Sequence, residues 1–128
     1  PGAGKDPLSL LACPLTYPVG IWTIPETSFI GYTADSAKKA GFKQVGEGVA
    51  EYKNTIRGRV QGIEQGLLKL VFSKPDGRIL GVHIFGEDAC ELIHYGTALA
   101  QSEKTVRDVL GVTFTAVTFH ELFVQAAQ

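Results

Sequence analysis

The sequence contains no methionine, only two cysteines and a single tryptophan among its 128 residues. Because translation starts at methionine, we expect the chain to be a fragment or a processed product. Cys13 and Cys90 are too few for a disulfide framework and lack the spacing of a metal site. Scarce cysteine favours a reducing compartment, and we therefore expect a cytoplasmic protein.

The chain also lacks an excess of charge of either sign. Its 12 basic and 13 acidic residues give a formal net charge of −1, and the basic residues are scattered. Binding to nucleic acid requires clustered Lys and Arg that neutralise phosphates, so we expect no nucleic-acid partner. No apolar run approaches the ~20 residues that span a bilayer, so we expect no membrane segment. The composition, with 45% hydrophobic residues, is that of one globular domain.

The beginning of the chain differs from the rest in its high proline content. Residues 1–18 contain four prolines and little periodic hydrophobicity, which predicts an extended arm or a linker. Residues 19–128 contain the periodic segments, and we expect them to form a single domain. No G-x-G-x-x-G fingerprint occurs in the chain, so we expect no dinucleotide site in these residues.

The centre of the chain is typical of an antiparallel hairpin followed by a helix. Residues 66–73 and 78–85 are rich in strand-forming side chains and flank the turn sequence Lys-Pro-Asp-Gly. After Gly86, apolar residues recur at helical spacing from Ala89 to about residue 102. Acidic residues lie at the start of this helix, where they complement the positive end of its dipole. The stretch LGVHIFGEDACELIHYG is therefore first of all a strand-turn-helix junction.

Weaker patterns predict the remaining elements. We expect a strand at residues 19–24, a bulged strand at 42–52, and an exposed turn or irregular edge strand at 55–62. We expect short helices at residues 33–41, 105–111 and 118–128. Strands and helices do not alternate regularly, so the pattern predicts an α+β fold, an antiparallel β-sheet with helices packed on one face.

One group of polar residues on the junction helix could bind a metal. Cys90 and His94 lie four residues apart, and with Glu87 or Glu91 they offer the ligand types that zinc accepts. However, the apolar stripe of the helix runs beside this flank, and a lone cysteine often packs as a small hydrophobic residue. We therefore favour packing and expect no metal site.

A second polar group lies in the last helix. Thr118 and Glu121 match a capping box, in which each side chain binds a backbone N–H at the other's position. His120 and Glu121 could suggest an acid/base pair, but adjacent helical residues point about 100° apart and do not face each other. We therefore expect a structural cap.

The order of three segments along the chain resembles a known family. The segments WTIPETSFIGYT, GLLKLVFSKPDGRILGVHIFGEDACELIHYGTALA and VTFTAVTFHELFVQAA are similar to the C-terminal dimerisation (interface) domain of FAD-dependent pyridine nucleotide–disulfide oxidoreductases. Within the family the resemblance is strongest to the soluble NAD(P) transhydrogenase branch, and next to dihydrolipoamide dehydrogenase. It implies an antiparallel sheet covered by helices, a homodimer, and FAD and NAD(P) bound by domains upstream of these residues.

The resemblance also implies roles for individual residues. The junction strand and helix would pack across a two-fold axis, with contacts from His83, Phe85, Glu91, His94, Tyr95, Ala98 and Phe119. Thr118 and Glu121 would lie near the flavin or contact the partner subunit. Gly96 would be small because neighbouring helices approach closely there.

One departure from the family pattern bears on function. Disulfide reductases of this family carry a His-Pro-Thr run before a Glu, and this His serves the partner subunit's dithiol as acid and base. Here Thr118 and Glu121 match, but Ala116 and Val117 stand in place of the His and the Pro. Alanine cannot transfer a proton. The resemblance therefore favours the transhydrogenase branch, which moves hydride between NADPH and NAD⁺ and lacks the dithiol.

Two alternatives stay open. The chain could be a free-standing dimeric binding or scaffold module derived from this domain, or part of a dihydrolipoamide dehydrogenase-like disulfide reductase. In each case we expect these residues alone to bind no cofactor and to be inactive.

Overall fold

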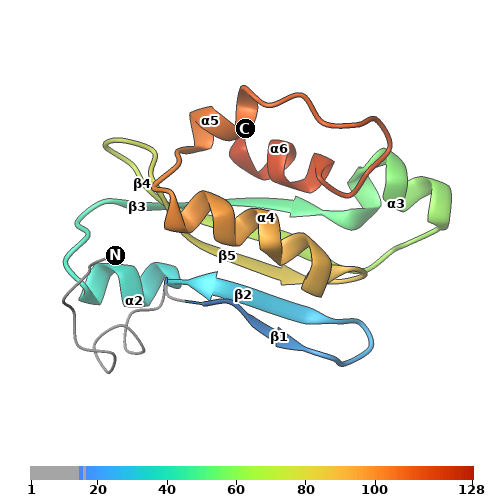
Figure 1. The fold of residues 1–128 in the computed structure, drawn as a ribbon, viewed down its shortest axis with the longest axis horizontal. Helices are drawn as coiled ribbons and strands as arrows, with labels where there is room; N and C mark the ends of the chain where they lie inside the picture. The colour runs from blue at the N-terminus through green and yellow to red at the C-terminus, as the bar shows by residue number, and fades with distance from the viewer. Residues whose placement is uncertain (1–14, 16) are drawn as a thin grey trace.

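Five antiparallel strands form one sheet at the centre of the molecule (Figure 1). The computed structural model describes Leu15 and residues 17–128, so the predicted arm at residues 1–18 lies almost wholly outside the described residues. The strand order along the sheet is β1-β2-β5-β4-β3. The strands are β1 (Val19–Ile21), β2 (Thr27–Gly31), β3 (Val45–Glu51), β4 (Leu67–Ser73) and β5 (Ile79–Phe85).

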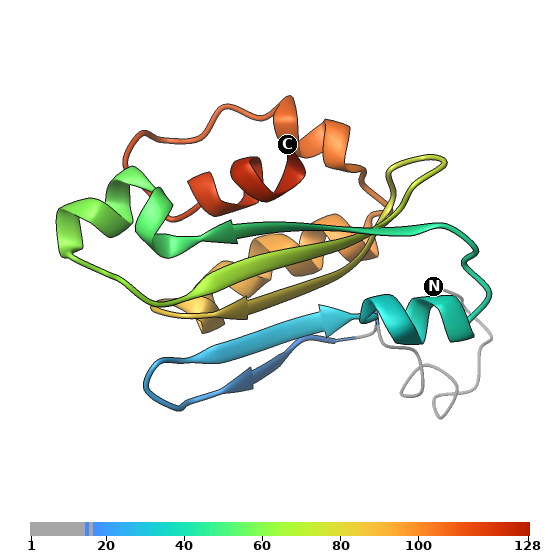
Figure 2. The same ribbon diagram turned by 180° about the vertical axis from the view of Figure 1, so that it is seen from behind.

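Short helices connect and cover these strands. They are α2 (Ala34–Lys39), the 3₁₀ helix η1 (Tyr52–Asn54), α3 (Ile56–Gln61), α4 (Ala89–Gln101), α5 (Val106–Leu110) and α6 (Glu121–Ala127). Seen from behind, the strands lie in front of α4 (Figure 2), and α4 and α6 share one core cluster with the sheet, so both helices cover the same face. Within the described part of the chain, no helix has the length and apolar character needed to cross a membrane.

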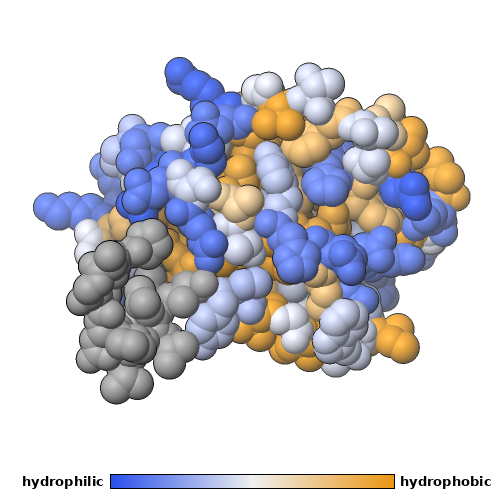
Figure 3. Space-filling model, in the orientation of Figure 1, coloured by the Kyte–Doolittle hydropathy of each residue, from blue (hydrophilic) through white to orange (hydrophobic). Residues whose placement is uncertain are grey.

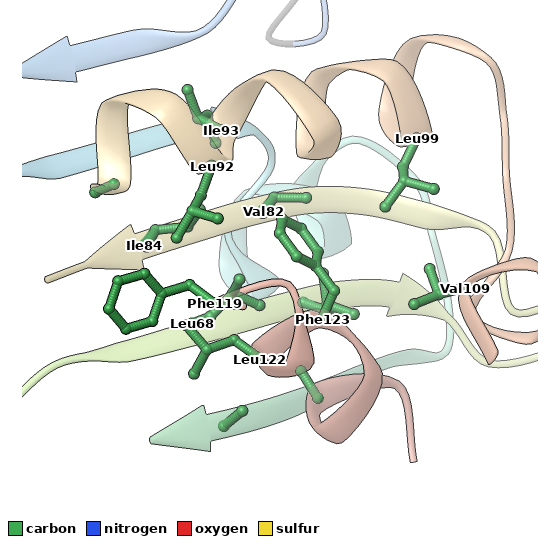
Figure 4. Close-up of a cluster of buried hydrophobic side chains, with 14 of the residues drawn as sticks. Leu68, Val82, Ile84, Leu92, Ile93, Leu99, Val109, Phe119, Leu122 and Phe123 are labelled. Atoms are coloured by element: carbon green, nitrogen blue, oxygen red, sulfur yellow. The ribbon is translucent and has the colours of Figure 1, made fainter. Parts of the chain in front are cut away.

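The main hydrophobic core lies between this face of the sheet and the two helices (Figure 4). Val82 and Ile84 of β5 and Leu68 of β4 point toward the helices and are buried. Leu92 of α4 and Phe123 of α6 meet them from the other side. Burial alternates from Val82 to Phe85, as in a strand that buries one face, whereas residues 79–82 are all buried because both faces of the sheet are covered there. The expected α+β fold is thus confirmed.

A smaller cluster lies on the opposite face of the sheet. Val71 follows the core residue Leu70 in β4, so the two side chains point to opposite faces. Val71 packs there with Leu80 and with Ala37 of α2, and all three side chains are fully buried. The short helix α2 therefore covers part of the face of the sheet that is opposite to α4 and α6.

The central hairpin confirms the turn prediction. β4 pairs with β5 from Leu67↔Phe85 to Phe72↔Ile79. In the connecting turn, the Asp76 carboxylate accepts a hydrogen bond from the backbone N–H of Arg78. The predicted bulge in residues 42–52 is wrong, because β3 pairs with β4 in continuous register. The irregularity lies instead between Val71 and Phe72, where β4 meets β5.

Two elements differ from the sequence expectations. Strand β2 was not expected, yet it lies between β1 and β5. The expected turn or edge strand at residues 55–62 is wrong, because these residues form α3. Thr55 caps α3 by accepting a hydrogen bond from the N–H of Gly58, and Gly62 ends it in a left-handed conformation with φ +69°. Threonine and glycine at these two positions are ordinary helix boundaries.

Helix α6 lies directly against β3 at a glycine. A Cβ atom at Gly48 would collide with the backbone carbonyl oxygen of Ala126. Only glycine permits this approach of helix to strand. The contact fixes the position of α6 and hence of the residues that precede it.

Candidate functional site

The junction between β5 and α4 is held by three contacts from two distant segments. The Glu26 carboxylate accepts a hydrogen bond from the backbone N–H of Cys90 (2.9 Å), in the first turn of α4. The buried Ser28 hydroxyl donates to the carbonyl of Ala89 (2.7 Å), and the Tyr52 hydroxyl donates to the carbonyl of Glu87 (2.6 Å). Asp88, at the N-cap position, makes no side-chain capping bond. The polar residues of the junction thus position a helix.

We expect Glu26→Ala to loosen the start of α4. The carboxylate satisfies a helix N–H and places negative charge near the positive end of the helix dipole. Its loss should lower the free energy of unfolding by about 1 kcal/mol, the typical effect of a lost cap. Hydrogen exchange should show faster exchange of the Cys90 amide, while Glu26→Gln, which keeps an acceptor, should exchange at an intermediate rate. An unchanged Cys90 rate in Glu26→Ala would contradict this role.

The Cys90 thiol is buried and unsuited to chemistry. Burial raises the pKa of the thiol, and the neighbouring Glu26 carboxylate raises it further, so the thiolate is disfavoured. His94, its proposed zinc co-ligand, is exposed. Among the residues that the structure describes, no three His, Cys, Asp or Glu side chains gather as a metal site would require.

The outward face of α4 is polar, with a small residue near its middle. Glu91, His94 and Ala98 are exposed, and Tyr95 is half-buried. Gly96 instead faces the sheet, where an added Cβ would lie 2.9 Å from Cγ1 of Val82. We expected Gly96 to be small because a neighbouring helix approaches it. This expectation is wrong, because Val82 of β5 in the same chain lies against Gly96.

A hollow of about 350 Å³ opens between α4 and α5. It is lined by Tyr95, Ala98, Leu99, Ser102, Lys104, Asp108 and Val112. Burial raises the pKa of the Tyr95 phenol, and the Asp108 carboxylate adds to this effect. On the face of the molecule that carries α4, hydrophilic and hydrophobic surface lie side by side (Figure 3).

The structure brings together only some of the seven residues expected at a dimer interface. Glu91, His94, Tyr95 and Ala98 share α4. His83 and Phe85 alternate with core residues of β5 and lie on the opposite face of the sheet. There the His83 ring lies 2.9 Å from the carbonyl oxygen of Tyr32 and stacks on Phe29. Phe119 is 6% exposed and packs against Tyr52 in the core.

The predicted capping box at Thr118 and Glu121 does not form. Residues 118–120 form tight turns before the helix, and α6 begins only at Glu121. Glu121 is therefore the first helical residue and not the third, as a capping box requires. The Thr118 hydroxyl donates to the carbonyl of Thr115. One Glu121 oxygen accepts from the N–H of Ile56 at the start of α3 (2.9 Å), and the other accepts from the Gln125 amide. Glu121 therefore joins α6 to a helix 65 residues earlier in the chain.

We expect Glu121→Ala to lower the free energy of unfolding by about 1 kcal/mol, as for a lost helix cap. Glu121→Gln should cost less, since an amide oxygen can still accept the bond from Ile56. Urea denaturation of both variants measures the difference. Equal losses in the two variants would show that the charge, and not the hydrogen bond, carries the effect.

His120 lies among aromatic rings. It stacks on Phe114 and Phe123 and meets Tyr95 edge-on. Burial lowers the pKa of the imidazole, which favours the neutral ring at neutral pH. These contacts agree with the expectation that His120 does not act with Glu121 as an acid/base pair.

Comparison with known proteins identifies the fold and its family. A family model described as the pyridine nucleotide-disulphide oxidoreductase dimerisation domain matches residues 17–127. The chain belongs to this family. Its similarity to the crystal structure of LpdA from Mycobacterium tuberculosis has a TM-score of 0.81 at 17% identity, covering 89% of this chain and 25% of that one. A flavoprotein disulfide reductase from Escherichia coli, RclA, gives a TM-score of 0.79 at 20% identity over 87% of this chain and 25% of that one.

Curated relatives of this dimerisation domain are much longer than the chain. A soluble pyridine nucleotide transhydrogenase of Mycobacterium tuberculosis is 38% identical over 110 residues, which cover 86% of this chain and 23% of the relative. The transhydrogenase of Yersinia enterocolitica is 36% identical over 115 residues, covering 86% and 24%. The chain therefore spans about a quarter of the length of these relatives.

The family depends on FAD and NAD(P), and the placement of Thr118 and Glu121 near the flavin or the partner subunit stays a prediction. The Thr118 hydroxyl and the Glu121 carboxylate both bind groups of their own chain. These residues hold the C-terminal segment in place.

Val117, at the position of the family's proline, adopts a left-handed conformation with φ +59°. This region is unfavourable for a β-branched residue, at a cost of roughly 1–3 kcal/mol. The Val117 carbonyl accepts a long hydrogen bond from Arg57 (3.4 Å), which connects the strained loop to α3.

We expect Val117→Asn to raise the free energy of unfolding by about 1 kcal/mol, because asparagine tolerates the left-handed region. Val112→Asn, at a similarly exposed valine without a positive φ, is the matched control and should give no gain. Thermal and urea denaturation provide the comparison. A destabilised Val117→Asn would indicate that the valine side chain contributes more than its conformation costs.

Proposed function

We propose that this chain is the dimerisation domain of a soluble NAD(P) transhydrogenase, a homodimeric flavoprotein that transfers hydride between NADPH and NAD⁺. The observation that carries the proposal is the match to soluble pyridine nucleotide transhydrogenases over 86% of the chain. Ala116 supports it, because a dithiol reductase needs an acid/base at that position and alanine offers none.

The contribution of these residues is assembly. FAD and NAD(P) would bind to other domains of a longer chain, and FAD would supply the hydride-transfer chemistry. The outer face of α4 would pair two copies, and the C-terminal segment would contact the partner subunit through residues near Thr118. A cytoplasmic location fits this proposal, because the nucleotide substrates are held there.

Exposed apolar residues fit a larger assembly. Ile21 at the end of β1 and Trp22 and Ile24 in the connection to β2 are exposed neighbours, at 45%, 77% and 102% exposure. Exposed apolar clusters on proteins commonly mark surfaces that bind other proteins. We propose that other domains of the flavoprotein cover them.

A second candidate is a free-standing dimeric scaffold module. The engagement of Thr118 and Glu121 by their own chain favours it, since neither side chain is held ready for a cofactor. A dihydrolipoamide dehydrogenase-like reductase is a third candidate, and Ala116 weighs against it.

Expression of the full open reading frame that encodes this chain tests the proposal. We expect a yellow protein that reduces an NAD⁺ analogue with NADPH and does not oxidise dihydrolipoamide. A reading frame no longer than this domain would favour the scaffold, and dihydrolipoamide oxidation would favour the reductase. Expressed alone, residues 1–128 should carry no flavin and should not oxidise NADPH.

A further inference from the structure

The two border strands of the sheet differ in how much backbone they offer to a partner. At one border, β1 has only three residues and lies between Pro18 and Pro25, so little of it is available for pairing. At the other border, β3 has seven residues without proline, and its register with β4 contains no bulge (Figure 2). A regular edge strand of this length is suited to pair with a further strand.

Alternate residues of β3 direct their backbone N–H and C=O groups away from β4. The N–H of Lys74 donates to the carbonyl of Gln44, and the N–H of Tyr52 donates to the carbonyl of Gly66. In an antiparallel pair, hydrogen-bonded residues alternate with residues whose backbone groups point outward. The even-numbered residues from 44 to 52 therefore bond to the β4 side, and the odd-numbered residues between them face the free edge.

The side chains at the outward positions lie on the exposed face of the sheet. Side chains alternate along a strand, and Gly48 faces α6, so Glu47, Val49 and Glu51 point to the opposite face. All three are exposed, Val49 by 51%. In the described part of the chain, no hydrogen bond occupies the outward backbone groups of Glu47 and Val49. A partner strand thus meets free backbone groups beside an acid, an apolar residue and a second acid.

We propose that the free edge of β3 binds an extended peptide segment of another protein by strand addition. The segment has a basic side chain opposite Glu47, an apolar side chain opposite Val49 and a basic side chain opposite Glu51. In this mode of recognition, main-chain hydrogen bonds supply affinity and alternate side chains supply selectivity. Opposite charges that face each other across two strands stabilise the pairing. The interaction does not depend on the proposed hydride transfer.

The two carboxylates retain capacity for such a partner. Glu47 lies 3.3 Å from the ammonium group of Lys69, and Glu51 lies 3.5 Å from that of Lys53. Exposed ion pairs of this kind contribute little to stability, and each carboxylate has lone pairs for further donors. A basic side chain of the partner therefore adds to these contacts without breaking a buried pair.

The same acids disfavour a second copy of β3 as the occupant. In an antiparallel pair of two β3 strands centred on Val49, Glu47 of each copy lies opposite Glu51 of the other. Like charges directly opposite each other destabilise a strand pair. The charge pattern therefore favours a basic segment over self-association.

Hydrogen exchange measured by NMR on the 128-residue chain tests the strand addition. The probe is a peptide with lysine, threonine, valine, threonine and lysine in that order, which presents lysine to both acids in either strand direction. In the free chain, the amides of residues 46, 48 and 50 should exchange slowly and those of 47 and 49 rapidly. With peptide at about ten times its dissociation constant, exchange at 47 and 49 should slow about tenfold, because only the unbound chain exchanges.

Two matched peptides separate the backbone contribution from the charge contribution. A peptide that is N-methylated at the valine and at both lysines lacks the donors for the ladder, and we expect it to bind about tenfold more weakly. A peptide with glutamate in place of lysine keeps these donors but places like charges opposite each other. It should also bind about tenfold more weakly.

Variants of β3 provide the complementary arm, with circular dichroism to verify folding. The double reversal Glu47→Lys with Glu51→Lys should exchange the preference, so that the glutamate peptide binds about tenfold more tightly than the lysine peptide. Val49→Pro removes an outward donor that an edge strand does not need for folding, and it should weaken binding about tenfold. Glu91→Lys, an exposed reversal on α4, which packs on β5 and β2, should bind the lysine peptide as the unmodified chain does.

Three results would overturn the proposal. Unchanged exchange at residues 47 and 49 with either peptide would show that no strand is added. Equal binding of the N-methylated peptide would reduce the interaction to charge alone. Protection of the outward amides at high chain concentration without peptide would identify a second copy, and not a basic segment, as the occupant of the edge.

Discussion

Truncation of Phe123 to alanine is expected to lower the free energy of unfolding by about 3–5 kcal/mol. Phe123 is completely buried at the centre of the core and projects from α6 toward Val82 of the sheet (Figure 4). Its ring lies 4.8 Å from that of Tyr95 in an edge-to-face contact, which stabilises aromatic pairs beyond their buried area. The substitution therefore leaves a cavity and removes the contact between α6 and α4.

Urea denaturation followed by tryptophan fluorescence and circular dichroism measures this effect. Val124→Ala is the matched control, because the neighbouring Val124 is only half-buried and its truncation should cost much less. A typical domain is stable by about 5–15 kcal/mol, so Phe123→Ala should leave a measurable unfolded population. A loss below about 1 kcal/mol would contradict the position of α6 in the core.

Replacement of Gly96 by leucine is expected to destabilise the folded chain by about 3 kcal/mol, at the upper end of the effect of overpacking. Val82 leaves no room beneath Gly96, and β5 cannot shift without disturbing its pairing with β2 and β4. Helix α4 would have to move away from the sheet.

Ala98→Leu, two residues along the same helix, separates folding from assembly. Ala98 is exposed, so a leucine there should leave the stability of the monomer nearly unchanged and should weaken dimerisation. The two variants are compared by urea denaturation at low protein concentration and by sedimentation at high concentration. The contradicting outcome is a Gly96→Leu variant that is as stable to urea as Ala98→Leu but no longer forms dimers. That result would show that Gly96 faces a partner subunit and not the sheet.

Local sequence signals predicted the central hairpin and the long helix well. Two of these signals are the turn sequence at residues 74–77 and the change from strand to helical spacing at Gly86. Each lies within a few residues, so it can be recognised without knowledge of distant contacts. The short helix α5 was similarly predictable, since Thr105 caps it and Gly111 ends it.

The strand β2 and helix α3 depend on contacts that the sequence does not show. Ser28 breaks the apolar pattern of β2, yet it is buried because its hydroxyl donates to the carbonyl of Ala89. Gly58 resembles a helix breaker in α3, but a Cβ there would collide with the carbonyl of Tyr52. In both cases a backbone carbonyl outside the element explains why this residue type occurs there. Local propensity alone disfavours serine in a strand and glycine in a helix.

The family could be predicted from the sequence, and the contacts of the candidate residues less so. The family resemblance, which the match to residues 17–127 confirms, led to α4 and to the C-terminal segment. The roles of Glu26 and Glu121 were missed, because each caps a helix more than 60 residues away. Capping rules consider only residues within one turn of the helix start. They cannot predict that a carboxylate from a distant part of the chain accepts a hydrogen bond from a helix N–H.

Sedimentation equilibrium of the 128-residue chain at micromolar concentrations tests the central claim most directly. A dimerisation domain should assemble without the rest of the protein, and we expect a reversible species of twice the 13.7 kDa chain mass. Ala98→Leu, run in parallel, should shift the equilibrium toward the monomer. A single 13.7 kDa species across the whole concentration range would contradict the account.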